Sequence, residues 1–115
     1  MAYDEVLAER IRSLLAGEPN LTEKRMFGGL AFLIGGNMSV SVSVSGQGGL
    51  LLRCEPVDTA ELVQELHAST AVMRGRAMEG WLRVAPEGVE SDEELQKWVT
   101  RGVGYARSLP SKPAR

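Results

Sequence analysis

The chain has 115 residues and a mass of 12.5 kDa, which corresponds to a single domain. Hydrophobic residues make up 43% and charged residues 24%, and this ordinary globular composition excludes a wholly disordered or collagen-like chain. The formal net charge of -2 provides no bulk attraction to nucleic acid or to anionic lipid.

One cysteine, Cys54, and one histidine, His67, are present. A single thiol cannot form an intrachain disulfide, and the two side chains are too few for a structural zinc site. The longest apolar stretch, 30–34, is far shorter than the ~20 residues of a membrane helix, and the acidic N-terminus lacks the layout of a signal peptide. We therefore expect a cytoplasmic protein that holds no metal and no cofactor and does not enter a membrane.

The first part of the chain changes from a helical to a strand pattern. Apolar residues at helical spacing predict an amphipathic helix over about 3–16, which Gly17 and Pro19 end. From Lys24 onward, two apolar pieces are joined by Gly28-Gly29. This pattern predicts one bent strand or two short ones, with the glycines in a bulge or a close backbone approach.

A strict alternation of serine and valine over 39–45 predicts a strand with one dry face and one wet face. Tight turns are expected on either side, at 35–37 and 46–49, and a more apolar, more central strand is expected at 50–54. The stretch 24–54 is thus predicted to be an antiparallel meander of three strands. Solvent or a partner is expected on the wet face, which carries Ser39, Ser41, Ser43 and Ser45.

The next elements are short. Asp58 and Glu61 have the spacing of a capping box, which predicts a helix over about 59–67. Two strands are expected after it, one at 71–73 and one at 80–84, with a turn that includes Arg74-Gly75-Arg76.

A second capping box at 91–94 predicts a final helix over about 92–108. The resulting order is α-β-β-β-α-β-β-α, in which short turns join neighbouring strands. We predict an α+β, two-layer sandwich, with an antiparallel sheet of about five strands covered on one face by helices. The domain is expected to span 1–109, and 110–115 to form a disordered basic tail.

Catalytic arrangements are not indicated. The glycine clusters lie between predicted strands, whereas a phosphate-binding loop leads from a strand into a helix N-terminus. Cys54 and His67 have no orienting acid at a suggestive spacing, and the paired carboxylates begin predicted helices, where the helix dipole favours anions. We predict no catalytic residue and a non-enzymatic protein. Core packing is expected for Met26, Met38, Met73 and Met78.

The best candidate for a binding surface lies near the second half of the predicted sheet. Arginines on either side of a glycine could hold a phosphate or a carboxylate, and a nearby tryptophan could stack on a base or a cation. The alternative is an exposed turn with the tryptophan in the core. Duplex binding is disfavoured because no helix is rich in Lys and Arg. The candidate partner-binding residues are Arg74, Gly75, Arg76, Trp81 and Arg83.

Two sequence motifs carry a resemblance to a known family. The run Arg25-Met26-Phe27-Gly28-Gly29 resembles the hallmark of the TfoX/Sxy family's N-terminal domain. The segment 73–84 looks like a second signature, that of stand-alone, actinobacterial-style members. The turn at 35–38 and the helix that begins near Glu94 are similar in order and spacing, so the resemblance covers about 3–108.

The resemblance implies the same α+β fold, with a structural role for the 25–29 motif. It also implies a link to regulators of natural competence, thought to act as co-activators beside a cyclic-AMP receptor protein. Those regulators carry a further C-terminal helix-hairpin-like domain, of which we expect no counterpart here.

Three functional hypotheses follow. The first is a non-enzymatic protein-interaction module, an adaptor or co-activator in transcription or competence-type regulation. The second is a direct nucleic-acid binder that uses the Arg74–Arg83 region and the basic tail. The third is a small-ligand-binding protein with a cleft between sheet and helices. A homodimer is a further expectation, since an unpaired strand edge can pair with a second copy.

Overall fold

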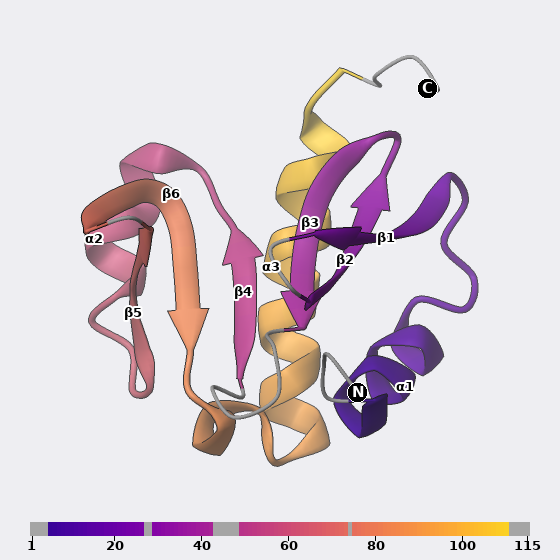
Figure 1. The fold of residues 1–115 in the computed structure, drawn as a ribbon, viewed down its shortest axis with the longest axis horizontal. Helices are drawn as coiled ribbons and strands as arrows, with labels where there is room; N and C mark the ends of the chain where they lie inside the picture. Colours follow the sequence, from indigo (N-terminus) through magenta and orange to yellow (C-terminus); the bar gives the residue numbers. More distant parts are fainter. Residues whose placement is uncertain (1–4, 27–28, 43–48, 74, 111–115) are drawn as a thin grey trace.

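The computed structural model describes residues 5–26, 29–42, 49–73 and 75–110. In that part of the chain, helices pack on a six-stranded antiparallel sheet with the strand order β1-β2-β3-β4-β6-β5 (Figure 1). This confirms the predicted α+β sandwich. In chain order the helices and strands are α1 (Glu5–Leu14), β1 (Leu21–Met26), β2 (Gly29–Ile34), β3 (Asn37–Val42), β4 (Leu50–Arg53), α2 (Thr59–Leu62), β5 (Ala68–Met73), β6 (Arg76–Val84) and α3 (Asp92–Ser108).

The sheet has one strand more than the sequence predicted. The pieces on either side of Gly28-Gly29 are two full strands, and β1 begins three residues before Lys24. The two strands pair along their whole length, with Leu21 opposite Ile34 and Met26 opposite Gly29. β1 is hard to recognise because its Thr22 and the three charged residues after it are exposed, as is usual for an edge strand.

The main core lies between the sheet and the helices. Figure 1 shows α3 running along one face of the sheet, and α1 lying beside it. Trp98 of α3 and Ile11 of α1 are fully buried in this core together with Phe32, Val40 and Leu52 of the sheet. Leu62 of α2 packs against its margin. The alternation of apolar residues along the strands therefore sets which face the helices cover.

The helix over Asp92–Ser108 begins as predicted. The Ser91 hydroxyl accepts a hydrogen bond from the Glu94 backbone N–H at 3.1 Å, and three acidic residues occupy the first turn. Arg107 lies in the last turn. This distribution of charge matches the helix dipole.

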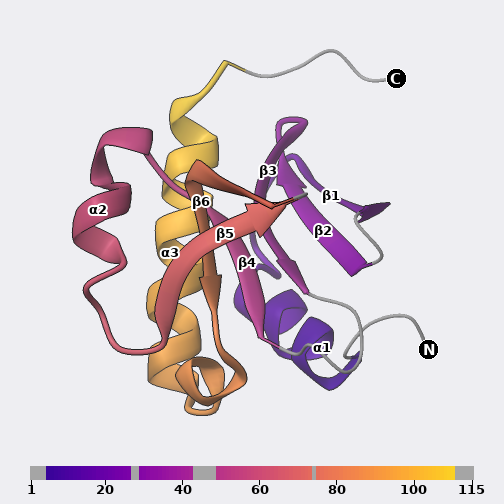
Figure 2. The same ribbon diagram turned by 60° about the vertical axis from the view of Figure 1, so that its left-hand side comes forward.

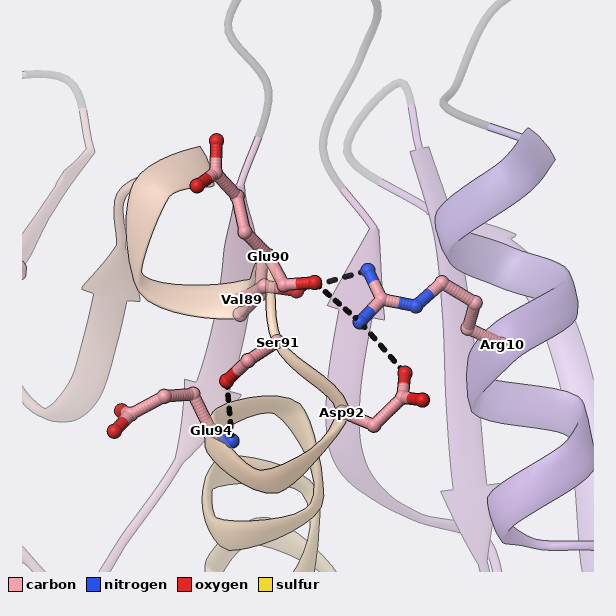
Figure 3. Close-up of polar contacts among 6 residues, drawn as sticks. All are labelled: Arg10, Val89, Glu90, Ser91, Asp92 and Glu94. Carbon is pink, nitrogen blue, oxygen red and sulfur yellow. Dashed lines mark hydrogen bonds and ion pairs between the residues drawn. The ribbon is translucent and has the colours of Figure 1, made fainter.

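Arg10 connects α1 to the start of α3. Its guanidinium donates to the backbone oxygens of Val89 at 2.8 Å and Glu90 at 3.1 Å, and to Asp92 Oδ1 at 3.1 Å. Figure 3 shows the side chain reaching from α1 to the turn before Ser91. Because that turn leads directly into α3, the contacts of Arg10 hold α1 and α3 in position relative to each other.

The opposite face of the sheet is also partly covered. β5 crosses in front of β6 and β4 in Figure 2, and Ala71 of β5 belongs to a small buried cluster on this face. We call this group the second cluster; its buried members are Ala31, Met38, Leu51 and Ala71.

The prediction of a wet serine face was wrong for the two serines that the structure describes. Ser39 is 0% exposed and Ser41 is 2% exposed. β3 is covered by α3 on one side and by the second cluster on the other, so alternation alone could not show that both faces are dry. Ser39 lies where the β2–β3 register shifts, and its hydroxyl donates to the Phe32 carbonyl oxygen at 2.8 Å. Ser43 and Ser45 lie outside the described residues.

The helix predicted over 59–67 is shorter than expected. α2 ends at Leu62, and His67 has a φ of 71° where the chain reverses into β5. The capping box is also wrong, because Asp58 belongs to a 3-10 turn with a helical backbone and its side chain caps nothing. The Thr59 hydroxyl instead accepts a hydrogen bond from the Gly80 N–H at 2.8 Å.

β5 and β6 begin earlier than predicted, at Ala68 rather than at 71 and at Arg76 rather than at 80, so Arg76 belongs to β6 and not to the predicted turn. The turn at 35–37 is confirmed as the β2–β3 hairpin, with positive φ at Gly35 and Gly36. The predicted turn at 46–49 and the predicted tail lie almost wholly outside the described residues. Pro110 is described, and its carbonyl oxygen accepts a hydrogen bond from Asn37 Nδ2 at 2.9 Å.

Candidate partner-binding surface

The five candidate residues lie on the β5–β6 hairpin but not in one cluster. Arg74 is outside the described residues. Gly75 is exposed in the hairpin turn with a φ of 77°, and Arg76 is the exposed first residue of β6, opposite Met73. Trp81 and Arg83 are half-buried and lie further along β6.

A bend at Gly80 separates the two groups. Gly80 has a φ of 87°, its N–H donates to Thr59 and its carbonyl oxygen accepts from the Cys54 N–H at 2.8 Å. Before this residue β6 pairs with β5 alone; after it, β6 pairs with β4 as well. A β-carbon at position 80 would lie 3.3 Å from Pro56 Cγ, so the bend favours glycine for both its backbone and its surroundings.

Trp81 lies beside an arginine that the sequence analysis did not single out. Trp81 is the register partner of Arg53 on β4 and packs against the second cluster. The Arg53 guanidinium carbon is 5.5 Å from the centre of the Trp81 ring and 5.4 Å from the centre of the Tyr105 ring on α3. These distances allow cation–π attraction to both rings. We call Arg53, Trp81 and Tyr105 the Arg53 cluster.

A second cationic group lies earlier on α3. Glu65 pairs with Arg101 at 2.7 Å and with Lys97 at 3.1 Å, and both cations lie within 5 Å of the Trp98 ring centre. The hydrogen bond from Arg101 is the main reason that the pKa of Glu65 lies below its ordinary value, against a smaller opposing effect of burial. Within the described residues, Trp98 Nε1 and Arg101 Nη1 are buried without an acceptor.

The lone thiol is placed for packing. Cys54 is 4% exposed, its Sγ lies 3.8 Å from Thr59 Oγ1, and burial raises the pKa of the thiol. A buried, protonated thiol is a poor nucleophile. His67 is exposed, and the structure shows no contact between it and Cys54 among the residues it describes. In those residues, no three His, Cys, Asp or Glu side chains gather as metal ligands.

The 25–29 motif lies at the hairpin between β1 and β2. Arg25 is exposed near the end of β1 and Gly29 is buried at the start of β2, while Phe27 and Gly28 are outside the described residues. The side chain of Met26 is likewise not described. The structural role that the resemblance implied for this motif stays a prediction.

The sequence indicates where Arg53 and Tyr105 lie in their own elements, but not that they meet Trp81. Arg53 interrupts an otherwise apolar strand, 50–54, which marks it as a residue at a sheet margin. Tyr105 lies one helical turn after Arg101 on the flank of α3. Their meeting with Trp81 depends on the order of β4 and β6 in the sheet, which no local pattern encodes.

Taken together, these features define an α+β domain with helices on one sheet face and a half-buried arginine and aromatic surface at the end of β4. The chain belongs to the TfoX N-terminal domain family, whose model matches residues 13–106 and so includes both motifs. The resemblance seen in the sequence is thereby confirmed. No curated protein matches the chain in sequence.

Family membership gives a general functional class. The TfoX N-terminal domain family is regulatory and of the competence type, and it is in general non-catalytic. None of the helices in the described ranges is both long and apolar enough to cross a membrane.

Proposed function

We propose that this protein is a non-enzymatic interaction module, an adaptor or co-activator in transcription or competence-type regulation, that binds a protein partner. The family supports the regulatory class. The observation that carries the proposal is the surface of β6 beyond Gly80, where Trp81 and Arg83 lie half-buried on the sheet face opposite α3. Tryptophan and arginine are the residue types most enriched at the energetic centres of protein interfaces.

The chemistry of the described side chains favours a non-enzymatic role. The thiol is buried with a raised pKa, and the carboxylates in the first turn of α3 lie at a helix N-terminus, where the dipole stabilises them. A nucleophile would need a base within hydrogen-bond reach, and the side-chain hydrogen bond of Cys54 among the described residues is with the hydroxyl of Thr59.

Affinity capture from native cells tests the proposal, with and without nuclease and with two variant baits. Arg83→Ala changes the proposed surface, whereas Arg107→Ala removes the same charge in the last turn of α3, where Arg107 pairs with Glu18. We expect the wild-type bait to capture proteins whose recovery does not depend on nuclease treatment. The Arg107→Ala bait should capture the same proteins, and the Arg83→Ala bait should not. Recovery of nothing above background, or equal recovery by both variants, would refute an interaction through this surface.

Direct nucleic-acid binding is the second candidate, and the exposure of Arg76 at the hairpin turn favours it. A contact of this kind would weaken steeply with salt because phosphate binding releases counterions. The double variant Arg74→Ala, Arg76→Ala should then bind single-stranded DNA several times more weakly at low salt. Unchanged binding in that variant would remove this candidate.

A further inference from the structure

We propose that the Arg53 cluster is an anchor for a carboxylate, contributed by an acidic segment of a protein partner. This inference rests on the proposed interaction function and names the chemistry of the partner. Arg53 would form paired hydrogen bonds with the carboxylate, while Trp81 and Tyr105 hold the guanidinium in place.

The geometry prepares the guanidinium for such a contact. Arg53 ends β4, Trp81 lies opposite it on β6, and Tyr105 approaches from α3, so three different elements fix the site. All three side chains are half-buried, which leaves them accessible but partly removed from water. Partial desolvation and a fixed side chain both strengthen a charged hydrogen bond, because less solvent screening and less ordering entropy oppose it.

Unlike the arginines that pair with carboxylates, Arg53 has its charge unmatched in the described part of the chain. Arg10, Arg101 and Arg107 each pair with a carboxylate of the chain. In the residues that the structure describes, Arg53 has no carboxylate within 4 Å and donates no hydrogen bond. A guanidinium carries five N–H donors in a planar fork that matches the two oxygens of a carboxylate.

A second arginine, Arg101 on α3, has an N–H group without an acceptor among the described residues. Arg101 lies one helical turn before Tyr105, and its Nη1 is buried without an acceptor in the described part of the chain. Buried donors without acceptors are rare in folded proteins. The charge of Arg101 is balanced by Glu65, so among these two arginines the unmatched charge is that of Arg53.

The surrounding charges favour a protein carboxylate over a nucleic-acid backbone. Glu55 follows two residues after Arg53, Asp58 lies just beyond it, and Glu79 precedes Trp81 by two residues; all three are exposed. A chain of phosphates would meet these carboxylates, whereas one carboxylate reaching Arg53 would not. The half-buried ring of Trp81 offers an apolar neighbour for the remainder of a peptide.

The test uses a fluorescein-labelled eight-residue peptide with one glutamate among leucine and serine residues, its glutamine counterpart and a short oligo-dT. Binding is measured by fluorescence anisotropy on the full chain. Arg53→Gln removes the charge, and Arg25→Gln is the matched control because Arg25 is an exposed arginine on β1, at the other edge of the sheet. We expect the acidic peptide to bind about 10- to 100-fold more weakly to the Arg53 variant, as for other charged hydrogen bonds, and within about twofold to the Arg25 variant.

Three results would overturn the inference: no binding of the acidic peptide, equal binding of the glutamine peptide, or equal losses in the two variants. Stronger binding of oligo-dT that also depends on Arg53 would assign the site to nucleic acid instead. If Arg53→Gln does not fold, peptide binding is measured on Arg53→Lys instead. The NMR signal of the Arg53 Nε–H is then followed in the wild type as a second measurement. That signal must shift with the acidic peptide and not with the glutamine peptide.

This inference and the proposed function can fail separately. If the Arg53→Gln bait still captures the partners, the proposed interaction function is supported and the carboxylate anchor at Arg53 is contradicted. Specific binding of the acidic peptide with an empty native capture would support the anchor and count against the regulatory role.

Discussion

Gly102 of α3 lies so close to Ser39 of β3 that a β-carbon at position 102 would stand 2.6 Å from the Ser39 carbonyl oxygen. The Val40 side chain would be only 2.8 Å away. Most of this contact is with the backbone of a central strand, which cannot move aside without disturbing its hydrogen bonds to two neighbours. The absence of a side chain at this point therefore sets how closely the helix approaches the sheet.

Replacing Gly102 with alanine should destabilise the protein by about 1–3 kcal/mol, because overpacking outweighs the gain in helix propensity. Gly104 is the matched control on the same helix, since a β-carbon there would meet nothing within 4 Å. Gly104→Ala should stabilise by up to about 1 kcal/mol. Urea unfolding measures both, and a Gly102→Ala protein as stable as the wild type would contradict the close contact.

Arg10→Ala should cost about 1–3 kcal/mol of unfolding free energy, because it removes the donors for two backbone carbonyls. Asp92→Asn tests the ion pair by itself. Asp92 is 94% exposed, and we expect a cost below about 1 kcal/mol. Thermal and urea unfolding should show the larger loss for the Arg10 variant, which removes the contacts with Val89 and Glu90 drawn in Figure 3. The reverse order would mean that the ion pair, rather than the carbonyl contacts, joins α1 to α3.

Thr59→Val should destabilise by about 1–3 kcal/mol, because the buried N–H of Gly80 loses its acceptor while the shape of the side chain is kept. Thr59→Ser keeps the hydroxyl and loses one methyl group, which is worth about 0.8 kcal/mol. The two variants are compared by chemical denaturation and by hydrogen exchange at Gly80. Equal stability and equal exchange in both would show that the hydroxyl does not support the bend in β6.

The ion pairs of Glu65 predict a dependence of stability on pH. Since the folded-state pKa of Glu65 is lowered from 4.5, its contribution is present above about pH 4.5 and is lost as the pH falls through the folded-state value. At neutral pH, Glu65→Gln should cost up to about 1 kcal/mol, as for a partly exposed pair. The difference from the wild type should shrink as the solution becomes more acidic.

Glu87→Gln provides the control for this measurement. Glu87 is exposed and has no ion pair in the described ranges, so its replacement should change stability little at any pH. Denaturation midpoints between pH 3 and pH 7 are the measurement. A Glu65→Gln difference that stays constant across this range would contradict a role for the charged carboxylate.

The sequence by itself determined much of the architecture. Capping and helical spacing located α3 between Asp92 and Ser108, and the two glycines at 35 and 36 located the β2–β3 turn. These features depend on contacts within a few residues, so a local pattern is enough to identify them. The 25–29 motif likewise indicated the family before any tertiary contact was known.

Tertiary structure decided what lies on each face of the sheet and which distant residues meet. β1 gains its strand conformation from pairing with β2, and Ser41 is buried because a second cluster covers a face that alternation marked as wet. Arg53, Trp81 and Tyr105 are brought together by the placement of β6 beside β4 and of α3 across the sheet. Periodicity reports which residues share a face, but the occupant of that face depends on packing between segments far apart in the chain.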